Sequence, residues 1–169
     1  MGLRQQVNTV MANVPVDATA FSVFDMKELS AESFDAGLAE AGDALAVVFF
    51  WGIDCFNCEI AKKAMLAQPE AIRALGLRWF HSNVYEHREL GGRFMLHGVP
   101  TWFFFYRGKR LGRATGWHGL GQFEAAVAAA REKIRAGAAP GGVPGNGAQA
   151  GAAASGKASA RTSGEGSAD

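Results

Sequence analysis

This chain has only two cysteines, Cys55 and Cys58, with two residues between them. A disulfide across so short a loop adds little to the stability of a fold, and disulfides are rare in reducing compartments. Two cysteines also cannot form a framework of several structural disulfides. The pair is therefore interpreted as reactive or metal-binding.

The chain also lacks an excess of charge of either sign. Its 17 basic and 16 acidic residues are scattered along the sequence and leave a net charge of +1. Binding to a phosphate backbone needs clustered lysine and arginine side chains, so nucleic acid is not expected as a partner.

Long apolar segments are missing as well. The longest apolar run, residues 44–51, is far too short to cross a bilayer, which takes about 20 residues. Residues 1–24 mix polar and charged side chains into their apolar ones, so they lack the continuous apolar segment of a secretory signal. We therefore expect a cytoplasmic protein without a membrane partner.

The residues that are present divide the chain into three parts. About half are apolar, which is enough for a packed core. Residues 137–169 are mostly Gly, Ala, Ser and Pro, and Val143 is their only large apolar side chain. Such a segment cannot bury enough surface to offset its ordering entropy. We expect an N-terminal extension at 1–20, a folded domain at 21–136 and a disordered tail at 137–169.

Strand and helix patterns alternate along the folded domain. Short apolar runs predict strands at residues 44–51, 77–84, 101–106 and 110–115. Helical patterns occur at residues 30–41, 55–68, 69–75, 89–96 and 122–135, the first with Ser30 as its candidate N-cap. This order predicts an α/β fold in which a mixed central sheet carries helices on both faces.

The cysteine motif, Cys55-Phe56-Asn57-Cys58, directly follows a predicted strand and opens a predicted helix. The unpaired N–H groups and the positive dipole end of a helix N-terminus stabilise a thiolate over a thiol. Cys55 is outermost and is the expected nucleophile. Cys58 lies one turn further on and is expected to resolve a mixed disulfide by attacking Cys55.

A second feature lies downstream, where Val99-Pro100-Thr101 leads into the strand at 101–106. A proline at the first residue of a strand is an ordinary device of sheet edges. Beside a CxxC motif in an alternating chain, it is also the position at which a cis proline would pack against the disulfide.

Residues 44–135 resemble the thioredoxin family. The positions that carry the resemblance are Trp51, Cys55, Cys58, Val99-Pro100-Thr101, Gly108 and Gly116. Within that family, the stretches 58–83 and 114–117 are most similar to the C-terminal thioredoxin-like domain of the bacterial transmembrane thiol:disulfide interchange protein and to its soluble relatives.

The resemblance implies a thioredoxin fold and a protein-disulfide oxidoreductase without a cofactor or metal. Its expected partners are disulfide-containing proteins and an upstream thiol reductase, and a monomer is expected. The implied catalytic residues are Cys55 and Cys58. The side chains expected around the substrate groove are Trp51, Phe56, Asn57, Val99, Pro100, Gly116 and Trp117.

The sequence also departs from thioredoxin around the motif. Phe49 stands where the family has a buried aspartate, and His81 stands where it has the lysine partner of that acid. Loss of the carboxylate is expected to lower the pKa of the nearby thiols, whereas Asp54 is expected to raise that of Cys55. The net direction stays open at this level.

Other interpretations compete with these. The cysteines form half of a zinc site if His81 and His87 complete it. The two histidines have a finger-like mutual spacing, but the gap from Cys58 to His81 is too long for a zinc finger. His81 is either a proton relay to Cys58 or simply a packed side chain, and the packed state is favoured. Asn57 and His118 are candidate modulators of the thiols.

The function of the whole chain also has an alternative interpretation. The departures at Phe49 and His81 suit a binding or redox-sensing module without efficient turnover. Trp117 either forms an apolar patch around the thiols or packs under the last helix. Trp51 is expected chiefly in the core, and the resemblance alone places it at the rim of the site. Lys62 and Lys63 are expected on a solvated helix face.

Overall fold

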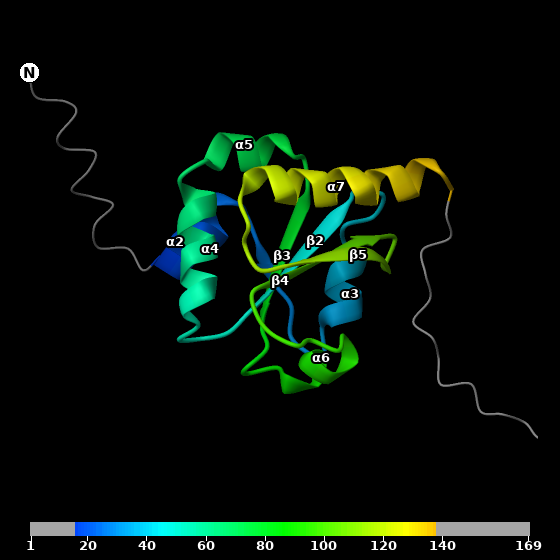
Figure 1. Cartoon of the computed structure of the whole chain (residues 1–169). Coiled ribbons are helices and arrows are strands. Elements are labelled where there is room, and N and C mark those ends of the chain that lie inside the picture. Colours follow the sequence, from blue (N-terminus) through cyan, green and yellow to red (C-terminus); the bar gives the residue numbers. More distant parts are fainter. Residues whose placement is uncertain (1–15, 138–169) are drawn as a thin grey trace, which may run out of the picture.

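The computed structural model describes residues 16–137. At its centre is a five-stranded sheet with the strand order β1-β3-β2-β4-β5 (Figure 1). The strands are β1 (Lys27–Glu28), β2 (Ala46–Trp51), β3 (Arg78–Asn83), β4 (Thr101–Tyr106) and β5 (Lys109–Thr115). β1, β2 and β3 run parallel, whereas β4 is antiparallel to β2 and β5 is antiparallel to β4.

The two central strands explain why this sheet forms. β2 reads Ala-Val-Val-Phe-Phe-Trp, and every one of its residues is buried. A continuous apolar run is typical of a strand that is covered on both faces. β4, with Trp102 and three phenylalanines, is buried along nearly its whole length and pairs with β2. The sheet is therefore anchored by apolar residues at its middle.

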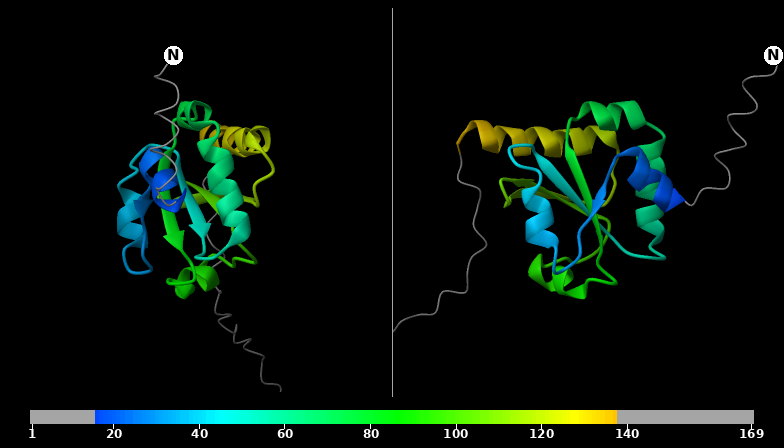
Figure 2. Two further views of the ribbon diagram at one scale, coloured as in Figure 1. Left: turned by 90° about the vertical axis from the view of Figure 1, so that its left-hand side faces the viewer. Right: turned by 180° about the vertical axis from the view of Figure 1, so that it is seen from behind.

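Helices cover both faces of the sheet, as the sequence predicted (Figure 2). On one face lie α4 (Phe56–Leu66), α5 (Pro69–Ala74) and α7 (Leu120–Arg135), which share a core cluster with alternate residues of β2, β3 and β4. On the other face lie α3 (Phe34–Ala39) and α6 (Arg88–Arg93), which share a second cluster with the intervening residues. The sheet thus separates two apolar cores.

Two elements were not predicted from the sequence. α2 (Val16–Val23) packs against α4, and β1 adds an edge strand next to β3. α2 crosses the domain boundary predicted at residue 20. The tail predicted at 137–169 lies outside the described residues except for its first residue, and so do residues 1–15. None of the described helices is long and apolar enough to cross a membrane.

The first predicted helix begins later than expected. Its N-cap is Ser33 and not Ser30, because the two serines hold a preceding turn together. The backbone N–H of Ser30 donates to Oγ of Ser33 at 3.0 Å, and the N–H of Ser33 donates to Oγ of Ser30 at 3.1 Å. This exchange satisfies the backbone groups locally and delays the helix.

Candidate active site

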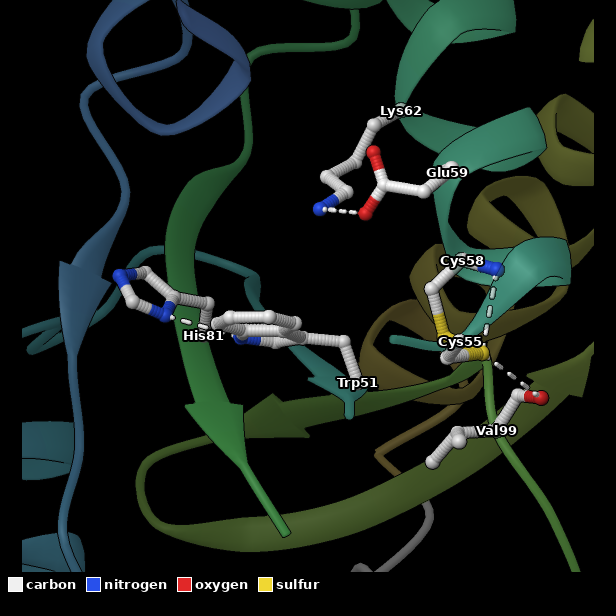
Figure 3. Close-up of polar contacts among 7 residues, drawn as sticks. All are labelled: Trp51, Cys55, Cys58, Glu59, Lys62, His81 and Val99. Atoms are coloured by element: carbon white, nitrogen blue, oxygen red, sulfur yellow. Dashed lines mark hydrogen bonds and ion pairs between the residues drawn. A yellow bond between two sulfur atoms is a disulfide. The ribbon is translucent and has the colours of Figure 1, made fainter. Parts of the chain in front are cut away.

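Cys55 and Cys58 lie where β2 passes into α4 (Figure 3). β2 ends at Trp51, and α4 begins at Phe56 with Cys55 as its N-cap. The backbone of Cys55 is extended, with φ −89° and ψ 103°, and its Sγ accepts a hydrogen bond from the backbone N–H of Cys58 at 3.2 Å. The two sulfur atoms form a disulfide.

The two cysteines differ in exposure. Cys58 is completely buried, whereas Cys55 is only partly buried. The sulfur of Cys55 faces the N–H groups of the first turn of α4, where the helix dipole favours a thiolate. Cys55 is therefore the more accessible of the two cysteines.

The Val99–Pro100 loop faces this sulfur. The Val99–Pro100 peptide bond is cis, and the carbonyl oxygen of Val99 lies 3.8 Å from Sγ of Cys55. The backbone N–H of Gly116 donates to the carbonyl oxygen of Pro100 at 2.9 Å, which joins the loop to the end of β5. The peptide bond of the predicted cis proline therefore lies near the disulfide through the carbonyl group of Val99.

A surface hollow of about 390 Å³ opens beside the disulfide. It is lined by Asn57, Ile60, Gly98, Val99, Pro100, Thr115, Gly116, Trp117 and His118. Five of the residues expected around a substrate groove line it: Asn57, Val99, Pro100, Gly116 and Trp117. Trp51 and Phe56 do not line it. Trp51 is buried in the core, and Phe56 is 77% exposed.

Large apolar side chains near the two cysteines in sequence are exposed. Ile53, Phe56 and Ile60 are exposed by 53%, 77% and 44%, and they flank the two cysteines in sequence. Large exposed apolar side chains that gather around one site mark a binding surface. Ile60 was not predicted, although it lies one helical turn beyond Phe56 on α4 and its position could have indicated it.

Trp117 fits both of the interpretations offered for it. Its ring centroid lies 5.8 Å from that of Trp102 and 5.6 Å from that of Phe123, so it packs between β4 and α7. It is only partly buried and also lines the hollow. One side chain therefore connects the core to the candidate binding surface.

His81 is a packed side chain, as favoured from the sequence. Its Nδ1 accepts a hydrogen bond from Nε1–H of Trp51 at 3.2 Å, and its ring stacks on that of Phe21 with centroids 3.8 Å apart. Burial and, to a smaller extent, the charge of Lys62 lower the pKa of His81 to about 4. His81 is therefore neutral at pH 7.

The sequence-based prediction for Lys62 is wrong, because this side chain is completely buried. Its Nζ lies 2.5 Å from Oε1 of Glu59 and 4.8 Å from the ring centroid of Trp51 (Figure 3). Lys63, its neighbour, is exposed as expected. The spacing could have indicated this burial, since position 62 lies four residues after Cys58 and three before Met65, both of which are buried.

The structure does not bring Cys55, Cys58, His81 and His87 together as one metal-binding group. Within the described part of the chain, the side chains close enough together to share a metal ion are Glu28, Glu86 and His87. Neither cysteine belongs to this group, and the cysteines are joined to each other. His87 lies with acidic residues of β1 and of the turn before α6.

No protein-family model matches the chain, and no curated protein matches its sequence. Solved thioredoxin structures match its fold. Thioredoxin f2 of Chlamydomonas reinhardtii has a TM-score of 0.53 and 19% identity, over 60% of this chain and 93% of that one. Spinach chloroplast thioredoxin f, in its short form, has a TM-score of 0.51 and 22% identity, over 63% and 93%. The thioredoxin of Malassezia sympodialis has a TM-score of 0.50 and 18% identity, over 61% and 88%.

At 18–22% identity these similarities establish the fold alone. The chain has the thioredoxin fold, which confirms the fold predicted from the sequence. The closer relation to the C-terminal domain of the bacterial thiol:disulfide interchange protein stays a prediction.

Proposed function

We propose that this protein is a thiol–disulfide oxidoreductase that reduces or exchanges disulfides of other proteins through Cys55 and Cys58. The observation that carries the proposal is the position of the disulfide. It lies at the N-terminus of α4, with Cys55 partly exposed and Cys58 buried behind it. A structural disulfide would gain nothing from this placement, because a loop of two residues adds little stability.

The reaction starts from the reduced protein. The thiolate of Cys55 attacks one sulfur of a substrate disulfide and forms a mixed disulfide, and the other substrate sulfur leaves as a thiolate that takes a proton from solvent. Cys58 then gives up its proton and attacks Sγ of Cys55. This releases the second substrate thiolate and regenerates the Cys55–Cys58 disulfide. Overall, the protein dithiol is oxidised and the substrate disulfide is reduced.

The hollow beside Val99 and Pro100 suits an extended polypeptide as the substrate. It is open, and residues of three separate segments line it, one of them Asn57, which follows the exposed Phe56 in sequence. Extended chains bind through their backbone groups and through alternate side chains, and an open surface of this kind can contact both. An upstream thiol reductase then returns Cys55 and Cys58 to the dithiol, since each turnover oxidises the pair.

Reduction of insulin by dithiothreitol, followed by precipitation of the free B chain, tests the proposal. The wild-type chain is expected to accelerate precipitation, and Cys55→Ser is expected to reduce the rate to that of dithiothreitol alone. Full activity of Cys55→Ser would contradict the mechanism. A wild type that is inactive, but whose cysteine pair is reversibly oxidised, would favour a redox-sensing module instead.

A further inference from the structure

Lys62 is a buried cation for which the proposed reaction so far has no use. Its side chain has 0% exposure, although it lies on a surface helix where Lys63 already faces solvent. Lysine is almost never fully buried unless it is paired, because removing its charge from water is costly. The partner here is Glu59, whose side chain is 31% exposed.

The aromatic side chains around Lys62 keep water away from its ammonium group. Nζ lies 4.8 Å from the ring centroid of Trp51 and 5.7 Å from that of Phe21. Trp51 is in turn held by its hydrogen bond to His81. Because His81 is neutral at pH 7, it adds no competing charge. The charge of Lys62 therefore acts in a shielded environment, where electrostatic interactions are stronger than in water.

Both charged residues lie on the helix that carries Cys58. Glu59 follows Cys58 directly, and Lys62 lies four residues after it. Residues four apart on a helix share one face, with Cβ atoms about 5–6 Å apart. Cys58 and Lys62 are both completely buried, which places them on the core side of α4. Figure 3 shows the Glu59–Lys62 pair above the two sulfur atoms.

Charges at this position affect only one of the two redox states. The disulfide is uncharged, whereas the dithiol gives up a proton to form the attacking thiolate. A nearby cation stabilises that thiolate, and a nearby carboxylate destabilises it. Stabilising the reduced state raises the reduction potential, as the oxidised state gains nothing.

We propose that Lys62 and Glu59 are positioning residues that shift the reduction potential of the Cys55–Cys58 couple in opposite directions. Lys62 favours the reduced pair by stabilising its thiolate, and Glu59 favours the disulfide by destabilising that thiolate. This inference rests on the proposed function of the cysteine pair. The charges that shift the reduction potential then lie on α4, about one turn from Cys58. Their effect is independent of β2, where Phe49 carries no charge.

The experiment equilibrates the full-length chain with mixtures of reduced and oxidised dithiothreitol at pH 7, and thiol labelling with mass spectrometry gives the oxidised fraction. At equilibrium, two electrons pass from reduced dithiothreitol to the protein disulfide. Both protons follow in molecules whose cysteines are thiols, and one of them goes to solvent in molecules in which Cys55 is a thiolate. Lys62→Met is expected to lower the equilibrium constant for reduction at least threefold, and Glu59→Gln to raise it at least threefold. Lys62→Arg keeps the charge and is expected to keep the wild-type value within twofold.

Two control variants separate this effect from general surface charge. Lys63→Met removes the exposed neighbouring cation, and Glu70→Gln breaks the exposed Glu70–Arg73 pair, which has the same spacing as Glu59 and Lys62. Both are expected to remain within twofold of wild type. A purely structural role would change the unfolding free energy of Lys62→Met and Glu59→Gln without moving their potentials in opposite directions.

The inference is overturned if Lys62→Met and Glu59→Gln shift in the same direction, or if neither leaves the range of the controls. If Lys62→Met does not fold, the other two variants decide the question. The equilibrium constant for reduction is then expected to rise in Glu59→Gln and to stay unchanged in Lys62→Arg. A wild type that fails to equilibrate with dithiothreitol contradicts the proposed function itself. A reversible wild type with unmoved variants contradicts only the role of Lys62 and Glu59.

Discussion

Nε1–H of Trp51 donates a hydrogen bond of 3.2 Å to Nδ1 of His81, which joins the end of β2 to the middle of β3 behind the disulfide. The bond requires Nδ1 to be without a proton. Burial, and secondly the charge of Lys62, meet this requirement by lowering the pKa of His81 to about 4. The ring of Phe21 then stacks on the neutral imidazole.

This relationship predicts a loss of stability in acid. In the unfolded chain, His81 takes up a proton near its ordinary pKa of 6.5, whereas in the folded protein it does so only near 4. The unfolded state therefore binds more protons between these values, so stability is complete above pH 6.5 and is lost as the pH falls toward 4. The full contribution is about 3 kcal/mol.

Urea unfolding at pH 7 and at pH 4 measures this loss. Because other groups also titrate in this range, the comparison is with His81→Gln, which lacks the titrating ring. His97→Gln removes an exposed histidine and is the matched control. An equal loss of stability in wild type and His81→Gln would show that His81 does not cause the acid sensitivity.

The order of attack that we propose for the cysteines predicts different products from two serine variants. Cys58→Ser keeps the accessible Cys55 but removes the buried sulfur that resolves the intermediate, so mixed disulfides with substrate are expected to accumulate. Cys55→Ser is expected to form none. Alkylation after acid quenching, followed by mass spectrometry of the adducts, distinguishes the two. Adducts on Cys58 in the Cys55→Ser protein would reverse the assigned order.

Phe56 is expected to contribute to substrate binding and not to folding. Its ring is 77% exposed, so Phe56→Ser is expected to change the unfolding free energy by less than about 0.5 kcal/mol. Burial of about 40 Å² of ring surface by a polypeptide substrate is worth about 1 kcal/mol, so KM for insulin is expected to rise roughly fivefold.

A small disulfide that does not reach the ring serves as the control substrate for Phe56→Ser. Its rate of reduction is expected to equal that of wild type. An unchanged KM for insulin would remove Phe56 from the binding surface, and a common loss on both substrates would point to the chemistry of Cys55 instead.

A side chain at position 116 is expected to strain the backbone and crowd His118. The φ of Gly116 is 71°, and a Cβ there would lie 3.0 Å from Nε2 of His118, which lines the hollow. Gly116→Ala is therefore expected to cost about 1–2 kcal/mol of stability and to raise KM for insulin. Gly91→Ala is the control, since Gly91 lies on α6 without a positive φ and its Cβ would meet no atom within 4 Å. Equal behaviour of the two variants in unfolding and in KM would contradict the prediction.

Much of the fold could be predicted, because strong local patterns and the tertiary structure agree. The buried run of β2 and the alanine-rich α7 formed close to the predicted ranges. β1 could not be predicted, since its two residues, Lys27 and Glu28, are exposed and polar and form a strand only by pairing with β3. Such edge pairing has no periodicity that a sequence pattern can detect.

The candidate site divides in the same way. The sequence by itself determined the two cysteines, their place between a strand and a helix, and Pro100 as a proline beside them, because these depend on residue type and spacing. Only the tertiary structure decided that Lys62 is buried beside Glu59 and Trp51. The spacing on α4 indicates the buried face of the helix. The aromatic rings of Trp51 and Phe21 that surround the ammonium group come from other segments, and the sequence near Lys62 does not contain that information.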